Sequence, residues 1–168
     1  MKIEESKIKE YQGETFNITK VDEVSKITFN NGDCIDNKEY YGKVFLGDCV
    51  GCLKINELYK DFTFDKILVL GLGLGLLPNY AKHVKNCSVV DVVDNNQELI
   101  DYVDYLHEDI AIIKHDAFTY KPNKKYDLVL VDLWWGYENI TEDIISSLKD
   151  NYESYLEDNG KMLIPVLQ

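Results

Sequence analysis

Three aspartates stand at the ends of largely apolar runs, and their chemistry suits a binding site. They are Asp94, Asp116 and Asp132. A carboxylate accepts hydrogen bonds from hydroxyl and amine groups, and it can take a proton from an attacking amine. In open α/β sheets, ligands bind beyond the carboxyl ends of the strands. We therefore expect these side chains to meet at one ligand site.

The clearest local signal is an apolar run that breaks into three alternate glycines, Gly71, Gly73 and Gly75. Residues 67–70 predict a strand buried on both faces, because no polar residue interrupts them. The glycines turn the chain sharply and let the backbone approach a ligand. A helix is expected from Leu76, with Pro78 in its first turn. Strand, turn and helix make the first half of a nucleotide-binding βαβ unit.

The glycine spacing argues against a phosphate ligand. A dinucleotide fingerprint needs Gly or Ala where Leu76 stands, and a triphosphate loop needs Lys followed by Ser or Thr, which this turn lacks. Asp94 lies about 20 residues beyond the glycines, where a carboxylate can accept hydrogen bonds from both ribose hydroxyls. The alternative role for Asp94 is to cap the helix that follows.

The periodicity of the rest of the chain predicts a doubly wound α/β fold. Further parallel strands are expected at residues 88–93, 110–117, 126–131 and 161–167. Further helices are expected from residue 94 and over 141–156, the latter stopped by Asn159 and Gly160. Residues 63–168 should thus form a Rossmann-like parallel sheet of order 3-2-1-4-5.

The segment before residue 63 has a different pattern. Antiparallel strands are predicted at 15–21, 24–29 and 40–45, followed by a helix over 49–62. We expect residues 1–62 to form a small β-hairpin region packed on the main domain. The fifth parallel strand would leave an apolar sheet edge, so we also expect an N-terminal strand or a second copy, in a homodimer, to cover it.

Composition narrows the range of partners. The chain has 168 residues and a formal net charge of −12, and all 18 basic residues are Lys. This charge repels nucleic acid and favours a small or cationic substrate. The chain shows neither a charged-then-apolar leader nor an apolar run of about 18 residues, which a membrane span requires. The expectation is a soluble, cytoplasmic protein that does not enter a membrane.

The four cysteines allow three interpretations. Cys49 and Cys52 have the spacing of a thioredoxin-like redox pair, but the preceding strand of such a site is lacking. All four could bind a metal ion together, or they could be small packing residues. We favour packing and therefore expect no metal site.

The motifs in their order resemble those of the S-adenosylmethionine-dependent methyltransferases and of the spermidine synthase family. The Gly-x-Gly-x-Gly turn is similar to motif I of these enzymes. The stretch from Asp94 to Ile100 resembles their Glu-x-Asp-Pro-x-x-Ile motif, with Asp94 in the Glu place and Asn96 in the Asp place. The run from Tyr126 to Asp132 resembles the spermidine synthase motif Tyr-Asp-x-x-x-x-Asp.

This resemblance implies a cofactor and a role for each residue. The cofactor would be S-adenosylmethionine or its decarboxylated form, bound at the glycine turn and, through the ribose, by Asp94 with Asn95 beside it. Asp116 would reach the exocyclic amine of adenine, and the backbone N–H of Ala117 a ring nitrogen. Asp132 would take a proton from an amine nucleophile or hold the methionine amino group. Trp134 and Trp135 could line the acceptor pocket through their π faces.

Three functions follow from these residues. The first is methyl transfer from S-adenosylmethionine to a small molecule, and the second is aminopropyl transfer of the spermidine synthase type. Against the second, Leu133 and Trp134 stand where those enzymes continue with a second acid and a proline, and Leu74 replaces the Asp of their glycine turn. The third is a non-catalytic protein that keeps the fold for binding or assembly.

Overall fold

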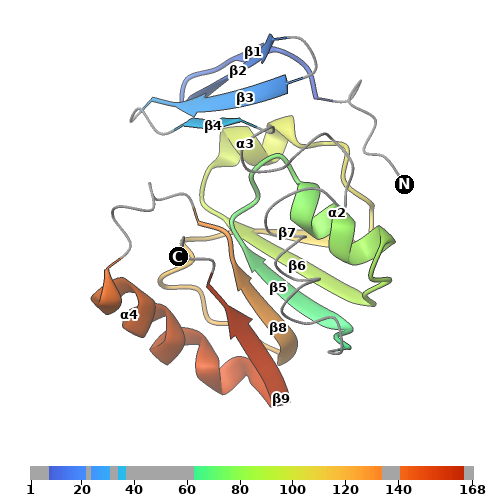
Figure 1. The fold of residues 1–168 in the computed structure, drawn as a ribbon, viewed down its shortest axis with the longest axis vertical. Coiled ribbons are helices and arrows are strands. Elements are labelled where there is room, and N and C mark those ends of the chain that lie inside the picture. The colour runs from blue at the N-terminus through green and yellow to red at the C-terminus, as the bar shows by residue number, and fades with distance from the viewer. Residues whose placement is uncertain (1–7, 22–23, 31–33, 37–62, 134–140, 165–168) are drawn as a thin grey trace.

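A computed structural model describes residues 8–21, 24–30, 34–36, 63–133 and 141–164 (Figure 1). They form a four-stranded antiparallel sheet of order β1-β2-β3-β4 and a five-stranded parallel sheet of order β7-β6-β5-β8-β9. In chain order the parallel strands stand as 3-2-1-4-5, so the predicted Rossmann-like topology is confirmed. The strands predicted at 40–45 and the helix at 49–62, with Cys49 and Cys52, lie outside the described residues.

The elements of the parallel sheet alternate between strands and helices. The strands are β5 (Lys66–Leu70), β6 (Val89–Asp94), β7 (Ile110–Lys114), β8 (Tyr126–Val131) and β9 (Leu156–Leu163). The helices are α2 (Leu76–His83), α3 (Gln97–Tyr102) and α4 (Glu142–Tyr152), with the 3-10 turn η3 (Glu153–Tyr155) after α4. The antiparallel strands are β1 (Tyr11–Gln12), β2 (Phe16–Val21), β3 (Val24–Phe29) and β4 (Cys34–Asp36).

The central strands are apolar because helices cover both faces of the sheet. Ile67 and Val69 of β5 belong to a core cluster that contains buried residues of α2 and α3. Leu68 and Leu70 face the other way, into a cluster with Leu148 and Tyr152 of α4. A strand buried on both faces reads as an unbroken apolar run, which is the signal that predicted β5 and β8.

One buried charge interrupts these strands. Asp91 of β6 is only 4% exposed. Its carboxylate accepts a hydrogen bond of 2.6 Å from the Tyr126 hydroxyl and forms an ion pair of 2.9 Å with Lys124. A buried carboxylate with both partners is well compensated, so Asp91 has a structural role.

The start of the last strand differs from the prediction. α4 ends at Tyr152, and β9 already begins at Leu156, so Asn159 and Gly160 lie inside the strand instead of stopping a helix. The β8–β9 register slips between Tyr126 and Leu128, which is an irregularity of the bulge type. A Cβ on Gly160 would lie 2.8 Å from the Tyr126 carbonyl oxygen, so the glycine serves this close approach.

The antiparallel sheet packs over α3, away from β9 (Figure 1). Its buried residues Phe16, Ile18 and Ile27 belong to the same core cluster as α2 and α3. In the described residues β9 pairs with β8 on one side, and no N-terminal strand covers its other edge. None of the described N-terminal strands covers that edge, and the strand predicted at 40–45 lies outside the described residues, so an N-terminal strand or a homodimer at this edge stays a prediction.

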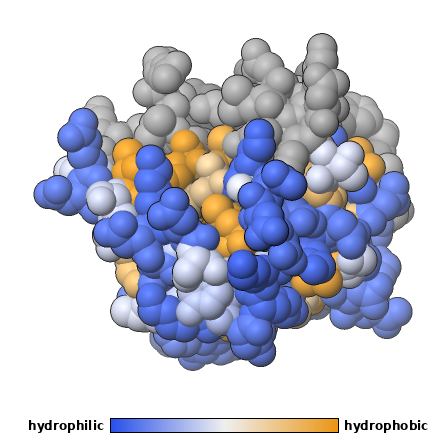
Figure 2. All heavy atoms as spheres, turned by 90° about the horizontal axis from the view of Figure 1, so that it is seen from below, coloured by the Kyte–Doolittle hydropathy of each residue, from blue (hydrophilic) through white to orange (hydrophobic). Residues whose placement is uncertain are grey.

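The described surface is mostly hydrophilic. On the side seen in Figure 2, hydrophilic residues cover most of the described surface, and hydrophobic residues show between them in the middle of the face. Among the described residues, Val84 is the exposed large hydrophobic, at 44%. None of the helices in this part of the chain has the length and apolar character to cross a bilayer.

Candidate functional site

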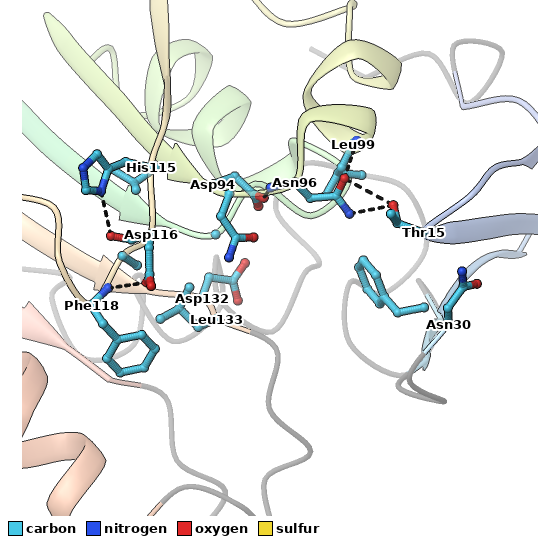
Figure 3. A pocket seen from close by; sticks show the side chains of 15 residues that line it. Thr15, Asn30, Asp94, Asn96, Leu99, His115, Asp116, Phe118, Asp132 and Leu133 are labelled. Atoms are coloured by element: carbon cyan, nitrogen blue, oxygen red, sulfur yellow. Dashed lines mark hydrogen bonds between the residues drawn. The ribbon is translucent and has the colours of Figure 1, made fainter.

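A cavity of about 420 Å³ lies at the carboxyl edge of the parallel sheet, and the antiparallel sheet contributes to its wall. This volume is in the range of small-molecule sites. Six of the residues predicted for the ligand site line it: Gly71, Asp94, Asn95, Asp116, Ala117 and Asp132. The strand ends thus bring the three aspartates to one place (Figure 3).

Gly71 joins the ends of three strands. Its φ is +103°, a conformation that favours glycine, and its N–H donates to the Val93 carbonyl oxygen at 2.8 Å. A Cβ on Gly71 would lie 2.2 Å from the carbonyl oxygen of Asp132. Only glycine therefore lets the turn pass so close to the end of β8, where Asp132 N–H donates to the Leu70 carbonyl oxygen at 2.7 Å.

The other two glycines shape the turn but are not among the residues that line the cavity. Gly73 and Gly75 have φ values of 51° and 73°. A Cβ on Gly75 would lie 2.6 Å from a methyl group of Leu106, so this glycine allows the turn to pack against the segment after α3. Leu72 and Leu74, between the glycines, are buried in the core cluster and are not among the residues that line the cavity.

Asp94 ties the glycine turn to the end of β6. Its carboxylate accepts hydrogen bonds from Leu72 N–H at 2.9 Å and from Asn96 N–H at 2.8 Å. Burial raises the pKa of Asp94, while these N–H groups and the backbone of Asn95 act against the rise. The cap of α3 is Asn96, whose side chain accepts from Leu99 N–H at 3.1 Å. The capping role considered for Asp94 thus belongs to Asn96.

Asp116 lies in the turn after β7 and is exposed. One oxygen of its carboxylate accepts from Phe118 N–H at 2.8 Å, which leaves the other for a ligand. The next residue, Ala117, is buried, and its carbonyl oxygen accepts from the Tyr152 hydroxyl at 2.5 Å. This bond anchors the turn on α4. His115 is exposed beside it, in agreement with the solvent-facing position predicted for it.

Asp132 differs from the other two aspartates because its carboxylate has no hydrogen-bond donor among the described residues. Burial removes water from around this carboxylate and raises the pKa of Asp132 to about 7. The group is therefore balanced between its charged and neutral forms at neutral pH. A cation bound beside it would favour the carboxylate.

The charged groups among the described lining residues of the cavity have one sign. Asp94, Asp116 and Asp132 line it, and no lysine is found among its described lining residues. Such a site attracts a cation and disfavours phosphate. No group of three or more His, Cys, Asp or Glu residues in the described chain is placed to hold a metal ion.

The antiparallel sheet supplies a wall of the cavity that the sequence does not predict. Thr15, Phe29 and Asn30 line the cavity, and Figure 3 shows Thr15 and Asn30 across from Asp116 and His115. Thr15 directly precedes β2, and Phe29 and Asn30 stand at the end of β3. The local sequence predicts these strands but carries no signal for what their ends face. Trp134 and Trp135, predicted to line an acceptor pocket, lie outside the described residues.

The comparisons with known proteins concern the fold. No protein-family model matches the chain, and no curated protein matches its sequence. Among solved structures, the plantazolicin methyltransferase BpumL, in complex with a monoazolic desmethylPZN analog and SAH, is 21% identical with a TM-score of 0.53 over 67% of this chain and 42% of its own. The glycopeptide N-methyltransferase MtfA is 16% identical, with a TM-score of 0.52 over 67% and 51%.

A third structure is an S-adenosylmethionine-dependent methyltransferase from Clostridium acetobutylicum ATCC 824, 19% identical with a TM-score of 0.52 over 67% of this chain and 46% of its own. The chain thus spans about half or less of the length of these three proteins. At such identities the likeness is one of fold. The chain therefore shares its fold with solved methyltransferases.

Proposed function

We propose that this protein is an S-adenosylmethionine-dependent methyltransferase that acts on a small molecule, and that the cavity is its cofactor site. The observation that carries the proposal is the set of three carboxylates at the carboxyl edge of the sheet, Asp94, Asp116 and Asp132, around a cavity without lysine among its described lining residues. The fold shared with methyltransferases supports the same assignment.

The donor set fits this cofactor. S-adenosylmethionine presents ribose hydroxyls, an adenine amine, an ammonium group and a sulfonium, all of which suit carboxylates, and it has no phosphate. In our proposal Asp94, with Asn95 beside it, accepts from the ribose hydroxyls. The backbone N–H groups that hold the Asp94 carboxylate fix its direction before a ligand arrives.

The turn after β7 is proposed to receive the adenine. The Asp116 oxygen that Phe118 does not use would accept from the exocyclic amine, and Ala117 N–H would donate to a ring nitrogen. Burial of Ala117 and its bond with Tyr152 hold this backbone in place.

Asp132 is the proposed catalytic residue. When bound, S-adenosylmethionine supplies a methyl group on a positively charged sulfur, ready for attack by a nucleophile. The Asp132 carboxylate lines the same cavity and, with a pKa raised to about 7, can accept the proton of an amine acceptor near neutral pH. It could equally orient the amino group of the cofactor. Trp134 and Trp135 remain proposed walls of the acceptor pocket.

Calorimetric titration with three ligands tests the proposal: S-adenosylmethionine, S-adenosylhomocysteine and decarboxylated S-adenosylmethionine. We expect the first two to bind, and Asp94→Ala to weaken both at least tenfold because the ribose loses its acceptor. Asp104→Ala, at an exposed site in the segment after α3, is the control and should bind normally.

The outcomes separate the three functions. A clear preference for the decarboxylated ligand would favour aminopropyl transfer. If no ligand binds, the enzyme hypotheses fail, and a non-catalytic role for the fold remains. Binding that Asp94→Ala leaves unchanged would contradict the assignment of this cavity.

A further inference from the structure

The Glu98 carboxylate on α3 connects the antiparallel sheet to the domain of the parallel sheet. Glu98 accepts from the Tyr11 hydroxyl at 2.9 Å and from Glu14 N–H at 2.7 Å through one oxygen. Its other oxygen accepts from Thr15 N–H at 2.7 Å and from the Thr15 hydroxyl at 2.6 Å. We call Tyr11, Glu14, Thr15 and Glu98 the Glu98 junction. Its four donors fill the acceptor capacity of the carboxylate.

The turn between β1 and β2 is built around this carboxylate. A Cβ on Gly13 would lie only 1.8 Å from Oε1 of Glu98. Glycine is thus needed here because the carboxylate occupies the place where a side chain would begin. The four donors also lower the pKa of Glu98 to about 2, so the junction keeps its negative charge throughout the neutral and mildly acidic range.

The junction continues to the cavity through Thr15. The side-chain amide of Asn96 donates to the Thr15 hydroxyl at 2.9 Å, and Asn96 N–H donates to Asp94. A chain of hydrogen bonds therefore runs from Glu98 through Thr15 and Asn96 to Asp94. Figure 3 shows its central link, between Thr15 and Asn96. Thr15 also holds Asn30, whose N–H donates to the Thr15 carbonyl oxygen at 3.0 Å. Both residues line the cavity.

We propose that Glu98 is a positioning residue, which fixes the antiparallel sheet as a wall of the cavity and couples the docking of that sheet to cofactor binding. The inference rests on the proposed function. Both the docked sheet and the bound ribose require Asn96 and Asp94 in one arrangement. Each should therefore stabilise the other, by the same factor in both directions.

A second anchor keeps the sheet attached when Glu98 is changed. The Tyr102 hydroxyl, one helical turn after Glu98, donates to the Lys9 carbonyl oxygen at 2.7 Å and accepts from Lys9 N–H at 2.9 Å. The Tyr102 ring also packs against Tyr11 and Phe16. Variants of Glu98 should therefore loosen the wall without unfolding the protein.

The test measures S-adenosylhomocysteine binding by calorimetry and amide hydrogen exchange of β2 and β3. In the wild type we expect the ligand to slow exchange in both strands. Glu98→Ala should weaken binding about tenfold, within the usual range of coupling between sites, and remove this protection. Glu98→Gln should also weaken binding, because the NH₂ group of glutamine would face hydrogen-bond donors of the junction instead of acceptors. Glu108→Gln, an exposed substitution, is the control.

Two further variants separate positioning from general damage. Thr15→Val removes the hydroxyl that joins Glu98 to Asn96, whereas Thr15→Ser keeps it, so serine should restore the affinity that valine loses. Gly13→Ala should reproduce Glu98→Ala, because the new methyl group displaces the carboxylate.

The outcomes are distinct. If wild type binds the ligand but Glu98→Ala binds within twofold of it and β2 and β3 show no ligand-dependent protection, the coupling is refuted and the proposed function stands. Equal loss in Thr15→Ser and Thr15→Val would also refute it. If wild type itself does not bind, both the function and the inference fail.

Discussion

Asp132 lines the cavity, and Glu98 lies behind its wall from the antiparallel sheet; the surroundings of these two carboxylates are opposite. Asp132, at the end of β8, has no donor among the described residues, and burial raises its pKa to about 7. Glu98, in the junction with the antiparallel sheet, has four donors, which lower its pKa to about 2. A carboxylate left without donors is available to a ligand, whereas one with every acceptor site filled holds structure together. In our proposal, the strand-end region is therefore the chemical part of the site, and the junction is its support.

The largest effect that tests this comparison is expected at the glycine turn. Gly71→Ala would place a Cβ 2.2 Å from the carbonyl oxygen of Asp132, which follows β8, and would put alanine at a φ of +103°. Because backbone cannot move aside as a side chain can, we expect a loss of at least about 3 kcal/mol in the free energy of unfolding. Urea denaturation measures it.

The matched variant is Gly13→Ala, where the nearest atoms belong to the side chains of Glu98 and Tyr11, which can rotate aside as backbone cannot. Its loss of stability should be clearly smaller than that of Gly71→Ala. Equal losses at the two glycines would contradict the distinction between a clash with backbone at Gly71 and a clash with side chains at Gly13.

The next effect concerns the uncompensated charge of Asp132. Between its unfolded pKa of 3.8 and its folded pKa of about 7, the folded protein holds a proton that the unfolded chain releases. Stability conferred by the protonated form is therefore lost as pH rises through this window. The Asp132→Asn variant should be more stable than wild type by about 2 kcal/mol at pH 8. The full pKa shift, at about 1.4 kcal/mol per pKa unit, would give about twice this value. We halve it because the Asp132 side chain is partly solvated.

Denaturation of both proteins from pH 4 to pH 8 measures this difference. We expect it to grow as pH rises and to be nearly absent at pH 4. A variant that is less stable than wild type at pH 8 would show that Asp132 has a stabilising partner and would weaken its assignment as a ligand-ready group.

The smallest effect, of opposite sign, is expected at Glu98. Its folded pKa lies below its ordinary value of 4.5, so its contribution is present above pH 4.5 and is lost as pH falls towards 2. Glu98→Gln should therefore be less stable than wild type at pH 6, and the two should converge near pH 2. A difference that stays constant from pH 6 to pH 2 would mean that the charge of Glu98 is not what the junction uses.

The same comparison explains what the sequence could predict. Strand order, β5, β8 and the meeting of three aspartates followed from apolar runs and glycines, because parallel strands buried on both faces leave an unbroken local pattern. The prediction that Asn159 and Gly160 stop a helix was wrong, because a turn-forming Asn-Gly pair also occurs in an irregular strand such as β9.

The junction left no such pattern. Tyr11 and Glu98 are 87 residues apart, and their hydrogen bond depends on how two sheets pack. A Glu in the first turn of a helix is common because it suits the helix dipole, so Glu98 gave no sign of a second role. Gly13 was the one available hint, and its meaning appears only when the carboxylate beside it is seen.

The central claim is that the cavity between the strand ends and the antiparallel sheet binds S-adenosylmethionine. A crystal structure of the protein with S-adenosylhomocysteine tests it most directly. We predict the ribose hydroxyls within hydrogen-bond distance of Asp94, the adenine at Asp116 and Ala117, and the sulfur on the side of Asp132. A ligand found elsewhere on the protein, or one whose ribose does not reach Asp94, would contradict the account.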